Sequence, residues 1–494
     1  MPQAHTGPKN YVFMLGDGFG PAHITLSRLV SQRDSLFMEK ELRGTVRTRS
    51  SSSTVTDSAA GATAYSCAQK TYNGAIGVSH DRVPLGTVAE AAKRNGMPVG
   101  LVTTTRVTHA TPASFSAHVD SRYSERYVAS QQIRQGFDVI FGGGMRVYDQ
   151  PAFLNNGSFA PHTVLEEAVQ MGYHVARNEK ELDSAQIPVL GLFASSHMSF
   201  EIDRVKENEG LPEGEGQPSL SKMTKKAMEL LSARAKATGA PGFFLLVEGG
   251  RIDHAAHSND PGSIAPEVVA YSDTIEQVTL FSIADGGATR LVSVADHETG
   301  GLTLGKWNGT VDPSDIYPFV STDANAPYPY IWRPDVLRAV RKSTEKMAQE
   351  LTGSEGVIDF DQYYALATGV PYLYPFEEDK IRPIVNALQK CTSNCGTLQY
   401  HAEMSLGWPV SNRAQVGFST HGHTGVDINL YAWGSATQAF AANMENTEVG
   451  QVVIDHLGLN ETLAIITQEL NDPASPKYVD RSAWDIARKY PETP

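Results

Sequence analysis

The sequence predicts an α/β protein, a three-layer α/β/α sandwich with a central, mostly parallel sheet. Short apolar runs recur along the 494 residues, and helical patterns lie between several of them. Continuous apolar runs of this length are typical of strands whose two faces are both covered by helices. The hydrophobic fraction of 41% and the charged fraction of 19% are those of a globular protein.

The expected elements follow the chain in a simple order. The runs that predict strands are "YVFML" (11–15), "PVGLVTTT" (98–105), "DVIF" (138–141), "GFFLLV" (242–247), "TRLVSVA" (289–295) and "VDINLYAWG" (426–434). Helices are expected at "PLGTVAEAAKRNG" (84–96) and at "SLSKMTKKAMELLSARAKATG" (219–239), which Gly239 ends. This alternation predicts a doubly wound sheet.

The stretch from about 305 to 420 interrupts the alternation. It holds Tyr- and Pro-rich segments, a helix expected near 335–352, and the motif "CTSNC". We therefore expect an α/β core formed by 1–304 and 421–494, and an insertion formed by 305–420. The spacing of Cys391 and Cys395 permits one small bridge, and the sequence leaves open whether it forms.

Composition and charge argue against several classes of protein. The net charge of −14 argues against a nucleic-acid-binding surface, because phosphate backbones require a basic face. No run approaches the ~18 apolar residues of a membrane span, and the start "MPQAHTGPKN" lacks the features of a signal peptide, so neither is expected in this chain. Three Asn-x-Ser/Thr motifs, at Asn156, Asn308 and Asn460, are close to the number expected by chance.

Polar side chains follow the expected strands, at the sheet edge where doubly wound proteins bind ligands. These strand-end residues are Asp17, His109, Thr111, Glu248, Asp253, His257, Asp296 and His297. Asp253 and His257 are four residues apart and would share one face of a helix, with oxygen and imidazole donors that suit Zn²⁺. Taken alone, each motif could equally be a solvated loop or a turn.

Together these residues exceed the ligands of one zinc ion, which is usually four-coordinate. Adjacent Asp296 and His297 can share an ion only on a sharply turning backbone, which the glycines at 300 and 301 allow. His421 or His423 in "STHGHTG" could complete a set. The excess carboxylates suit a harder ion such as Mg²⁺. The sequence thus predicts two zinc-type sites and one magnesium-type site.

Two further residues bear on chemistry. Ser58 follows Asp57 where a polar loop gives way to an Ala-rich helical stretch, so it is either a helix cap or a nucleophile. Arg122 could hold two phosphate oxygens with its guanidinium fork, or form a surface ion pair.

Seven motifs in order resemble the alkaline phosphatase family. They are "GDGFG" (16–20), "VTDSAAGATA" (55–64), "THATPA" (108–113), "HVDSR" (118–122), "VEGGRIDHAAH" (247–257), "ADHETGG" (295–301) and "GHTG" (422–425). The region "RTRSSSSTVTDSAAGATA" looks most like fungal members. The resemblance implies hydrolysis of phosphate monoesters through a phosphoserine intermediate, with two Zn²⁺, one Mg²⁺ and low leaving-group selectivity.

The resemblance also implies a role for each residue. Ser58 matches the nucleophile, Arg122 the phosphate clamp and Asp57 the residue that orients it. The zinc ligands would be Asp253, His257 and His423 in one site and Asp17, Asp296 and His297 in the other, with Asp17, Thr111 and Glu248 at the magnesium site. His423 is preferred to His421 because it lies in the His-Thr-Gly motif.

His109 and His254 lie beside the metals and the phosphate in this comparison. Some bacterial members carry Asp and Lys there, and the two-His arrangement resembles animal enzymes. His109 could therefore admit Zn²⁺ at the third site.

The resemblance further implies a homodimer, in which the 305–420 insertion would be a crown-like segment beside the interface. It implies phosphate monoesters and inorganic phosphate as partners, and a secreted, vacuolar or periplasm-like compartment. The rival interpretations are a phosphodiesterase or sulfatase on the same architecture, and a phosphate- or metal-binding protein without turnover.

Overall fold

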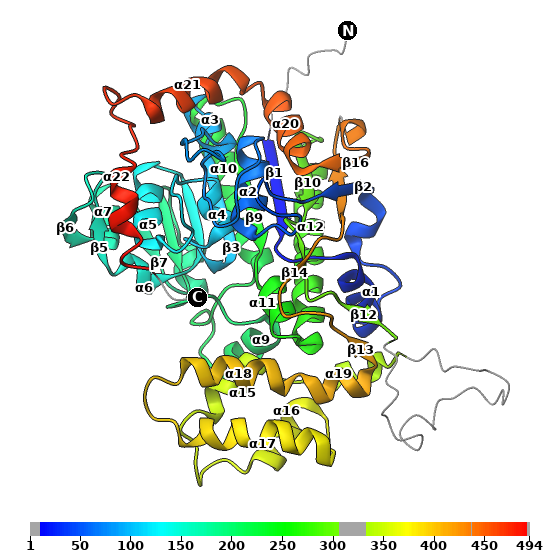
Figure 1. Ribbon diagram of the computed structural model, residues 1–494. Coiled ribbons are helices and arrows are strands. Elements are labelled where there is room, and N and C mark those ends of the chain that lie inside the picture. The colour runs from blue at the N-terminus through cyan, green and yellow to red at the C-terminus, as the bar shows by residue number, and fades with distance from the viewer. Residues whose placement is uncertain (1–9, 306–331, 436, 492–494) are drawn as a thin grey trace.

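A ten-stranded sheet runs through the centre of the molecule, in the order β16-β2-β15-β10-β1-β9-β3-β4-β8-β7 (Figure 1). The computed structural model describes residues 10–305, 332–435 and 437–491. In sheet order the strands are β16 (Ala442–Glu445), β2 (Leu42–Arg47), β15 (Ile428–Trp433), β10 (Thr289–Val294), β1 (Asn10–Gly16), β9 (Phe244–Gly249), β3 (Val99–Arg106), β4 (Val139–Gly143), β8 (Val189–Leu192) and β7 (His174–Ala176). β15 is antiparallel to both of its neighbours, and the other pairs of this sheet are parallel.

The six apolar runs in the sequence correspond to β1, β3, β4, β9, β10 and β15. β1, β9 and β10 are buried along their whole length, which is why each is a continuous apolar run. In register, Leu15 of β1 lies beside Glu248 of β9 on one side and Val294 of β10 on the other. These three strands therefore end at the same edge of the sheet.

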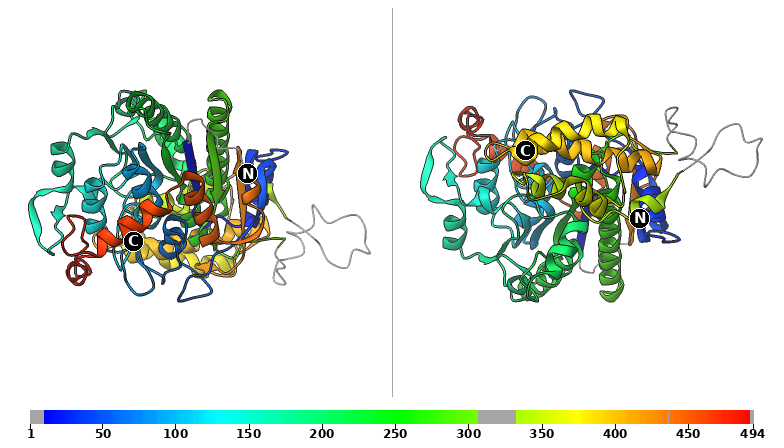
Figure 2. Two further views of the ribbon diagram at one scale, coloured as in Figure 1. Left: turned by 90° about the horizontal axis from the view of Figure 1, so that it is seen from above. Right: turned by 90° about the horizontal axis from the view of Figure 1, so that it is seen from below.

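Helices cover both faces of the sheet, as Figure 2 shows from above and below. α10 (Leu220–Thr238) and α12 (Pro261–Ala284) pack on one face, and α2 (Ser58–Cys67), α3 (Val88–Arg94), α4 (Ala110–Ser114) and α20 (Asn446–Leu457) form the layer on the other. The Ser219 hydroxyl accepts a hydrogen bond from the Lys222 N–H at the start of α10, and Gly239 ends that helix at φ +68°. The α/β/α architecture predicted from the sequence is confirmed.

The other described helices and small strand pairs connect these layers. The helices are α1 (Pro21–Val30), η1 (Phe37–Glu41), α5 (Glu125–Arg134), α6 (Met145–Tyr148), α7 (Val164–Gln170), α8 (Glu179–Asp183), α9 (Glu201–Glu209), α11 (Arg251–His257), η2 (Thr437–Ala439), α21 (Asn460–Asn471) and α22 (Ser482–Ala487). The strand pairs are β5 (Pro151–Phe153) with β6 (Phe159–Thr163), β11 (Glu298–Thr299) with β14 (His423–Thr424), and β12 (Thr303–Leu304) with β13 (Val416–Gly417).

Helices dominate the described part of the 305–420 stretch and gather at one end of the molecule (Figure 1). They are α14 (Pro334–Arg338), α15 (Thr344–Leu351), α16 (Phe360–Thr368), α17 (Pro375–Lys390), α18 (Gly396–Leu406) and α19 (Trp408–Ala414). The single helix expected near 335–352 is two helices, because Ser343 caps a new start by accepting a hydrogen bond from the Lys346 N–H. Residues 306–331 of the predicted insertion lie outside the described residues, and the division into core and insertion stays a prediction.

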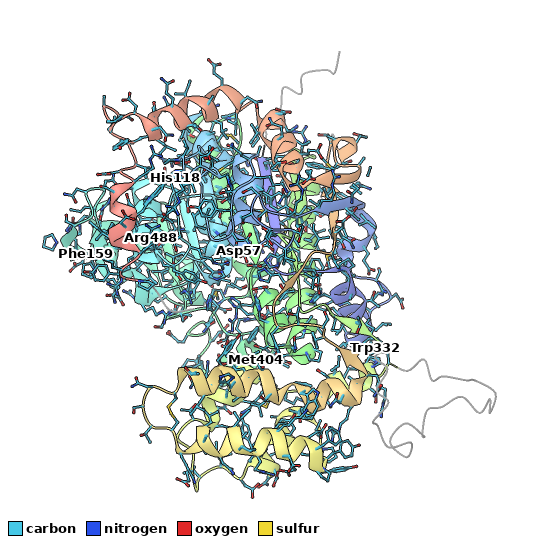
Figure 3. The ribbon with its side chains drawn as sticks, in the orientation of Figure 1. Asp57, His118, Phe159, Trp332, Met404 and Arg488 are labelled. Atoms are coloured by element: carbon cyan, nitrogen blue, oxygen red, sulfur yellow. A yellow bond between two sulfur atoms is a disulfide. The ribbon has the colours of Figure 1, made fainter. Side chains whose placement is uncertain are left out.

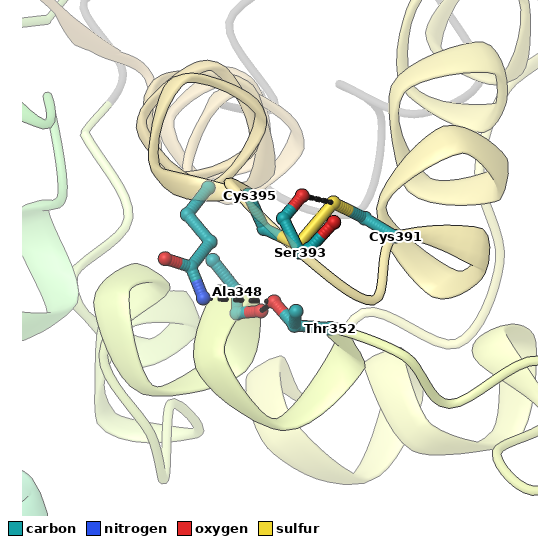
Figure 4. Close-up of a disulfide and its surroundings, with 6 residues drawn as sticks. Ala348, Thr352, Cys391, Ser393 and Cys395 are labelled. Atoms are coloured by element: carbon teal, nitrogen blue, oxygen red, sulfur yellow. Dashed lines mark hydrogen bonds between the residues drawn. A yellow bond between two sulfur atoms is a disulfide. The ribbon is translucent and has the colours of Figure 1, made fainter.

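A disulfide joins Cys391 and Cys395, the pair that the sequence left open. It closes the turn between α17 and α18, near Thr352 at the end of α15 (Figure 4). Cys67 in α2 is free and buried. None of the described helices has the length and apolar character needed to cross a membrane.

Candidate active site and metal centre

The ends of β1, β9 and β10 bring acidic side chains to one place. Asp17 follows β1, Glu248 lies near the end of β9, and Asp296 lies two residues after β10. All three carboxylates are fully buried. Because the strands are adjacent and parallel, residues far apart in the sequence converge at this edge.

The short helix α11 follows β9 and adds Asp253 and His257. The two residues are one turn apart, and His257 Nε2 lies 3.3 Å from Asp253 Oδ2. The turn after β1 approaches α11 closely: a Cβ on Gly18 would lie 2.7 Å from Asp253 Cα, and its φ of +68° favours glycine. The glycine thus allows Asp17 and Asp253 to share one centre.

Three groups of side chains bring their ligand atoms within 4.8 Å of one another. The groups are Asp253 with His297 and His423, Asp17 with Asp296 and His297, and Asp17 with His109 and Glu248. His257 was expected in the first set, and its Nε2 lies 3.1 Å from His423 Nε2. His421 is in none of these groups; its Nδ1 faces the carbonyl oxygen of His257 at 2.8 Å.

Several possible metal-ligand atoms in these groups, and one on Thr111, lack a hydrogen-bond partner among the described residues. The buried atoms without a hydrogen bond include Asp17 Oδ2, His109 Nδ1, Thr111 Oγ1, Glu248 Oε1 and Asp296 Oδ2. A buried polar atom without a partner is costly, and a cation would satisfy these oxygens and this nitrogen. The mixture of carboxylate, imidazole and hydroxyl donors fits Zn²⁺ and Mg²⁺. The residues present therefore fit the predicted metal ions.

The pKa shifts of the buried carboxylates and of His297 also favour bound cations. Burial, and then the negative charge of Asp296, raise the pKa of Asp17 well above its ordinary value. Burial, and then the charge of Asp253, raise the pKa of Asp296 to about 8, and burial raises that of Glu248 to about 7. Burial, and then the neighbouring His423, hold the pKa of His297 well below its ordinary value. Added positive charge is needed before all these carboxylates ionise together.

Ser58 is the first residue of α2, and Asp57, the residue before it, is the cap. Asp57 accepts a hydrogen bond from the Ala60 N–H at 3.0 Å. Because Asp57 caps the helix, the Ser58 side chain is not needed as the cap and is available for chemistry. The Ser58 Oγ–H donates to Asp17 Oδ1 at 3.3 Å, and Oγ lies 3.1 Å from His297 Nε2. The start of α2 also favours an anion through its N–H groups and dipole.

Arg122 lies beside the start of α2, where Asp57 holds it. Its Nη1 donates to Asp57 Oδ2 at 3.1 Å, and its Nη2 lies 3.1 Å from His109 Nε2. Burial lowers the pKa of Arg122, and the carboxylate of Asp57 more than offsets this, so the pKa is raised overall. Figure 3 shows Asp57 near the middle of the molecule. A positively charged guanidinium therefore lies beside the start of α2 in an otherwise acidic chain.

Thr299 was missed by the sequence analysis. Its hydroxyl donates to Asp253 Oδ1 at 2.6 Å and lies 3.1 Å from His297 Nδ1, so it links two of the metal-capable groups. The only signal in the sequence is its place two residues after His297 in "ADHETGG".

His197 was also missed, and no motif around it could have indicated it. Its ring packs against His254 at 4.4 Å and against His109 at 5.3 Å, measured between ring centroids. Arg106 Nη1 lies 2.6 Å from His197 Nε2, and Arg251 Nη1 lies 2.7 Å from His254 Nδ1. Burial first, and then neighbouring positive groups, lower the pKa of all three histidines well below its ordinary value. His197 and His254 therefore pack as uncharged rings against His109, the histidine of the third group.

Known proteins of one family resemble this chain in sequence and in fold. The family model described as alkaline phosphatase matches residues 8–459. An alkaline phosphatase from Schizosaccharomyces pombe is 36% identical over 97% of this chain and 87% of its own length. The repressible alkaline phosphatase of Saccharomyces cerevisiae is also 36% identical, over 92% of this chain and 82% of its own. The crystal structure of Thermus thermophilus alkaline phosphatase matches with a TM-score of 0.74 and 28% identity, over 99% of each chain.

Proposed function

The chain belongs to the alkaline phosphatase family and is a phosphatase, and we propose that it hydrolyses phosphate monoesters through a phosphoserine formed on Ser58. Its resemblance to fungal members extends over nearly the whole chain. The observation that supports Ser58 as nucleophile is its place at the start of α2, with Oγ within reach of Asp17 and His297 and with Arg122 opposite.

In the first step, Ser58 Oγ attacks phosphorus in line with the leaving oxygen. The hydroxyl proton is released to solvent, while the Asp17 carboxylate that it faces stays ionised. The Oγ–P bond forms as the bond to the leaving oxygen breaks. The Arg122 guanidinium and the N–H groups at the start of α2 hold the phosphate oxygens during this change.

In the second step, water attacks the phosphoserine from the side that the leaving group vacated and loses a proton to solvent. The new O–P bond forms as the Ser58 Oγ–P bond breaks, Oγ regains a proton, and inorganic phosphate leaves, so configuration at phosphorus is retained overall. Bound in the three groups, two Zn²⁺ and one Mg²⁺ would lower the pKa of the attacking hydroxyls and offset the negative charge of the leaving oxygen. We assign Asp253, His257 and His423 to one zinc and Asp17, Asp296 and His297 to the other. Asp17, Thr111 and Glu248 would hold Mg²⁺, and His109 lies close enough to admit Zn²⁺ at this site.

We propose low selectivity for the leaving group, because the residues brought together bind phosphate and metal and none of them is aimed at an organic group. A homodimer, a crown-like role for 305–420, and a secreted, vacuolar or periplasm-like location are proposals by analogy with the family.

The test is Ser58→Ala in metal-loaded protein. We expect activity on an aryl phosphate to fall by ~10³-fold or more, and phosphoserine at position 58 to vanish from peptide mass spectra of enzyme quenched in acid. Ser52→Ala, in the neighbouring serine run, should keep both. Normal turnover of the Ser58 variant, or phosphate on another serine, would contradict the proposal. Rates on bis-aryl phosphate and aryl sulfate separate the phosphodiesterase and sulfatase alternatives.

A further inference from the structure

Asn156 lies at the tip of the β5–β6 hairpin, in the motif Asn-Gly-Ser. The side chain is exposed, and the chain reverses around it through a hydrogen bond from the Leu154 N–H to the Ser158 carbonyl oxygen. The neighbouring Phe159 projects from the edge of the molecule, far from Asp57 and the phosphatase centre (Figure 3). A large polar group on this tip would meet neither the sheet nor the active site.

The local geometry leaves the amide nitrogen of Asn156 available. Ser158 donates twice to Asn156 Oδ1, from its hydroxyl at 2.7 Å and from its backbone N–H at 3.1 Å. Within the described part of the chain, Asn156 Nδ2 has no hydrogen-bond partner. Gly157 between them has φ +81°, and a Cβ there would lie 2.4 Å from Ile486 Cδ1, so the turn that presents Asn156 depends on glycine.

The other motifs differ in this respect. Asn460 Nδ2 donates to Asp455 Oδ1 at 2.8 Å, and the Thr462 hydroxyl donates to Asn95 Oδ1 at 2.8 Å. A glycan on Asn460 would have to break contacts that tie the start of α21 to its surroundings. Asn308 lies outside the described residues.

A second observation concerns the compartment. The disulfide between Cys391 and Cys395 closes a turn whose intervening residues are exposed. Disulfides of this kind persist in oxidising compartments such as the endoplasmic reticulum, where Asn-x-Ser/Thr motifs also meet the transferase that modifies them.

We propose that Asn156 is an N-glycosylation site of this phosphatase. The donor is an oligosaccharide linked through a diphosphate to a membrane lipid. Asn156 Nδ2 forms a bond to the first sugar carbon and loses one proton, while the bond from that carbon to the diphosphate oxygen breaks and the lipid diphosphate leaves with the electron pair. The bulky, polar product stays in solvent because the Asn156 side chain is exposed.

The experiment is secretion of the full chain from a eukaryotic host behind a secretion leader. Enzymatic release of N-glycans in ¹⁸O-labelled water, followed by peptide mass spectrometry, marks each occupied asparagine as labelled aspartate. We expect the label at position 156, with loss of the corresponding gel shift in Asn156→Gln and in Ser158→Ala.

Matched variants sharpen the result. Ser158→Thr keeps the hydroxyl and should keep the glycan, whereas Asn460→Gln should leave the label at 156 unchanged. Asn156→Gln should retain phosphatase activity, since it lies outside the active site, and this shows that the variant folds. An unlabelled Asn156 in secreted, active protein, or a full gel shift that survives Asn156→Gln, would overturn the proposal.

Discussion

Asp57 links the start of α2 to the guanidinium group of Arg122. One carboxylate oxygen caps α2 through the Ala60 N–H, and the other accepts from Arg122 and from the Gly74 N–H. The position of the guanidinium is therefore set by the same side chain that starts the helix carrying Ser58. Substitution of Asp57 should therefore weaken the cap of α2 and displace the Arg122 guanidinium at the same time.

Thr299 is the residue for which the structure makes the sharpest single prediction. Its hydroxyl donates to Asp253, so its oxygen must accept a hydrogen bond from His297 Nδ1–H. His297 Nε2 is then the unprotonated ring nitrogen, and its lone pair faces Ser58. Thr299→Val removes both contacts, and we expect zinc affinity to fall by about ten- to a hundredfold. Chelator titration with direct metal analysis measures this.

Thr299→Ser is the control, because it keeps the hydroxyl at the same position. It should hold zinc nearly as well as the parent protein. Equal chelator sensitivity of the Val and Ser variants would show that the hydroxyl does not position these ligands.

Among the elements, α2 is packed unusually closely on two sides. A Cβ on Gly61 would lie 2.8 Å from the Cβ of Asp296, and a Cβ on Gly450 of α20 would lie 2.3 Å from the carbonyl oxygen of Tyr65. The small residues of α2 allow this approach of the helix to the backbone that carries Asp296.

Replacement of Gly by Ala inside a helix normally stabilises it by roughly 0.5–1 kcal/mol. Gly61→Ala should do the opposite, since the new methyl group must displace Asp296, and both the melting temperature and the zinc content should fall. Gly396→Ala, at the exposed start of α18 with open space around it, is the control that should be neutral or slightly stabilising. Calorimetry and metal analysis of both variants decide the matter; a Gly61 variant as stable as the control would refute the packing argument.

The contact between α3 and the segment that leads to Arg122 predicts that the free energy of unfolding depends on pH. His118 Nε2 lies 3.0 Å from Glu90 Oε1, and its Nδ1 lies 3.0 Å from the Gly77 carbonyl oxygen, so both ring nitrogens face acceptors (His118 is labelled in Figure 3). Burial lowers the pKa of His118, and the charge of Glu90 outweighs this, so the pKa lies above its ordinary value of 6.5. The stabilisation that the charged His118 gives the folded state is then complete below pH 6.5, and it is lost as pH rises through the higher folded-state pKa.

His118→Gln should therefore remove part of the pH dependence of the unfolding free energy. Above pH 6.5 the parent protein should lose stability relative to the variant by at most about 1.4 kcal/mol per pH unit, the effect of one proton. Urea unfolding at several pH values measures it, with the exposed His401→Gln as control. Parallel curves for parent and His118 variant would contradict a charged His118.

The elements differ in how well the sequence predicted them. β1, β9 and β10 were readable because strands buried on both faces need apolar side chains at every position. β2 was missed because it lies near the sheet edge and is largely exposed, so "LRGTVR" contains no apolar run.

The residues of the site also differ in whether the sequence alone could indicate them. Asp17 and Asp296 follow apolar strands and could be found from that position, whereas Thr299 and His197 act through contacts that only the folded chain creates. Whether Asp57 or Ser58 caps α2 depends on the exact residue at which the helix begins. Sequence patterns do not place helix ends to within one residue.

For the molecule as a whole, metal removal should change the pH dependence of stability. In metal-free protein, burial raises the folded-state pKa of Asp296 from 3.8 to about 8 and that of Glu248 from 4.5 to about 7. Between those values the folded chain binds more protons than the unfolded chain, so the free energy of unfolding falls as pH rises from about 4 to 8. Melting temperatures of chelator-treated protein should therefore drop over this range.

Protein saturated with Zn²⁺ and Mg²⁺ should show a much weaker decline, since the ions keep these carboxylates ionised when folded. Differential scanning calorimetry at pH 5.5, 7 and 8.5 with and without metal makes the comparison. Identical pH profiles for the two forms would show that the carboxylates are not the metal ligands.

The sheet order also has a consequence for synthesis. The members of the metal-capable groups range from Asp17 to His423, and β1, at the start of the chain, pairs with β9 and β10, which come much later in the sequence. A ribosome delivers Asp17 first and His423 only after the helical segment that precedes it. The group of Asp253, His297 and His423 is therefore completed last during synthesis, and a product truncated before residue 423 lacks one of its three side chains.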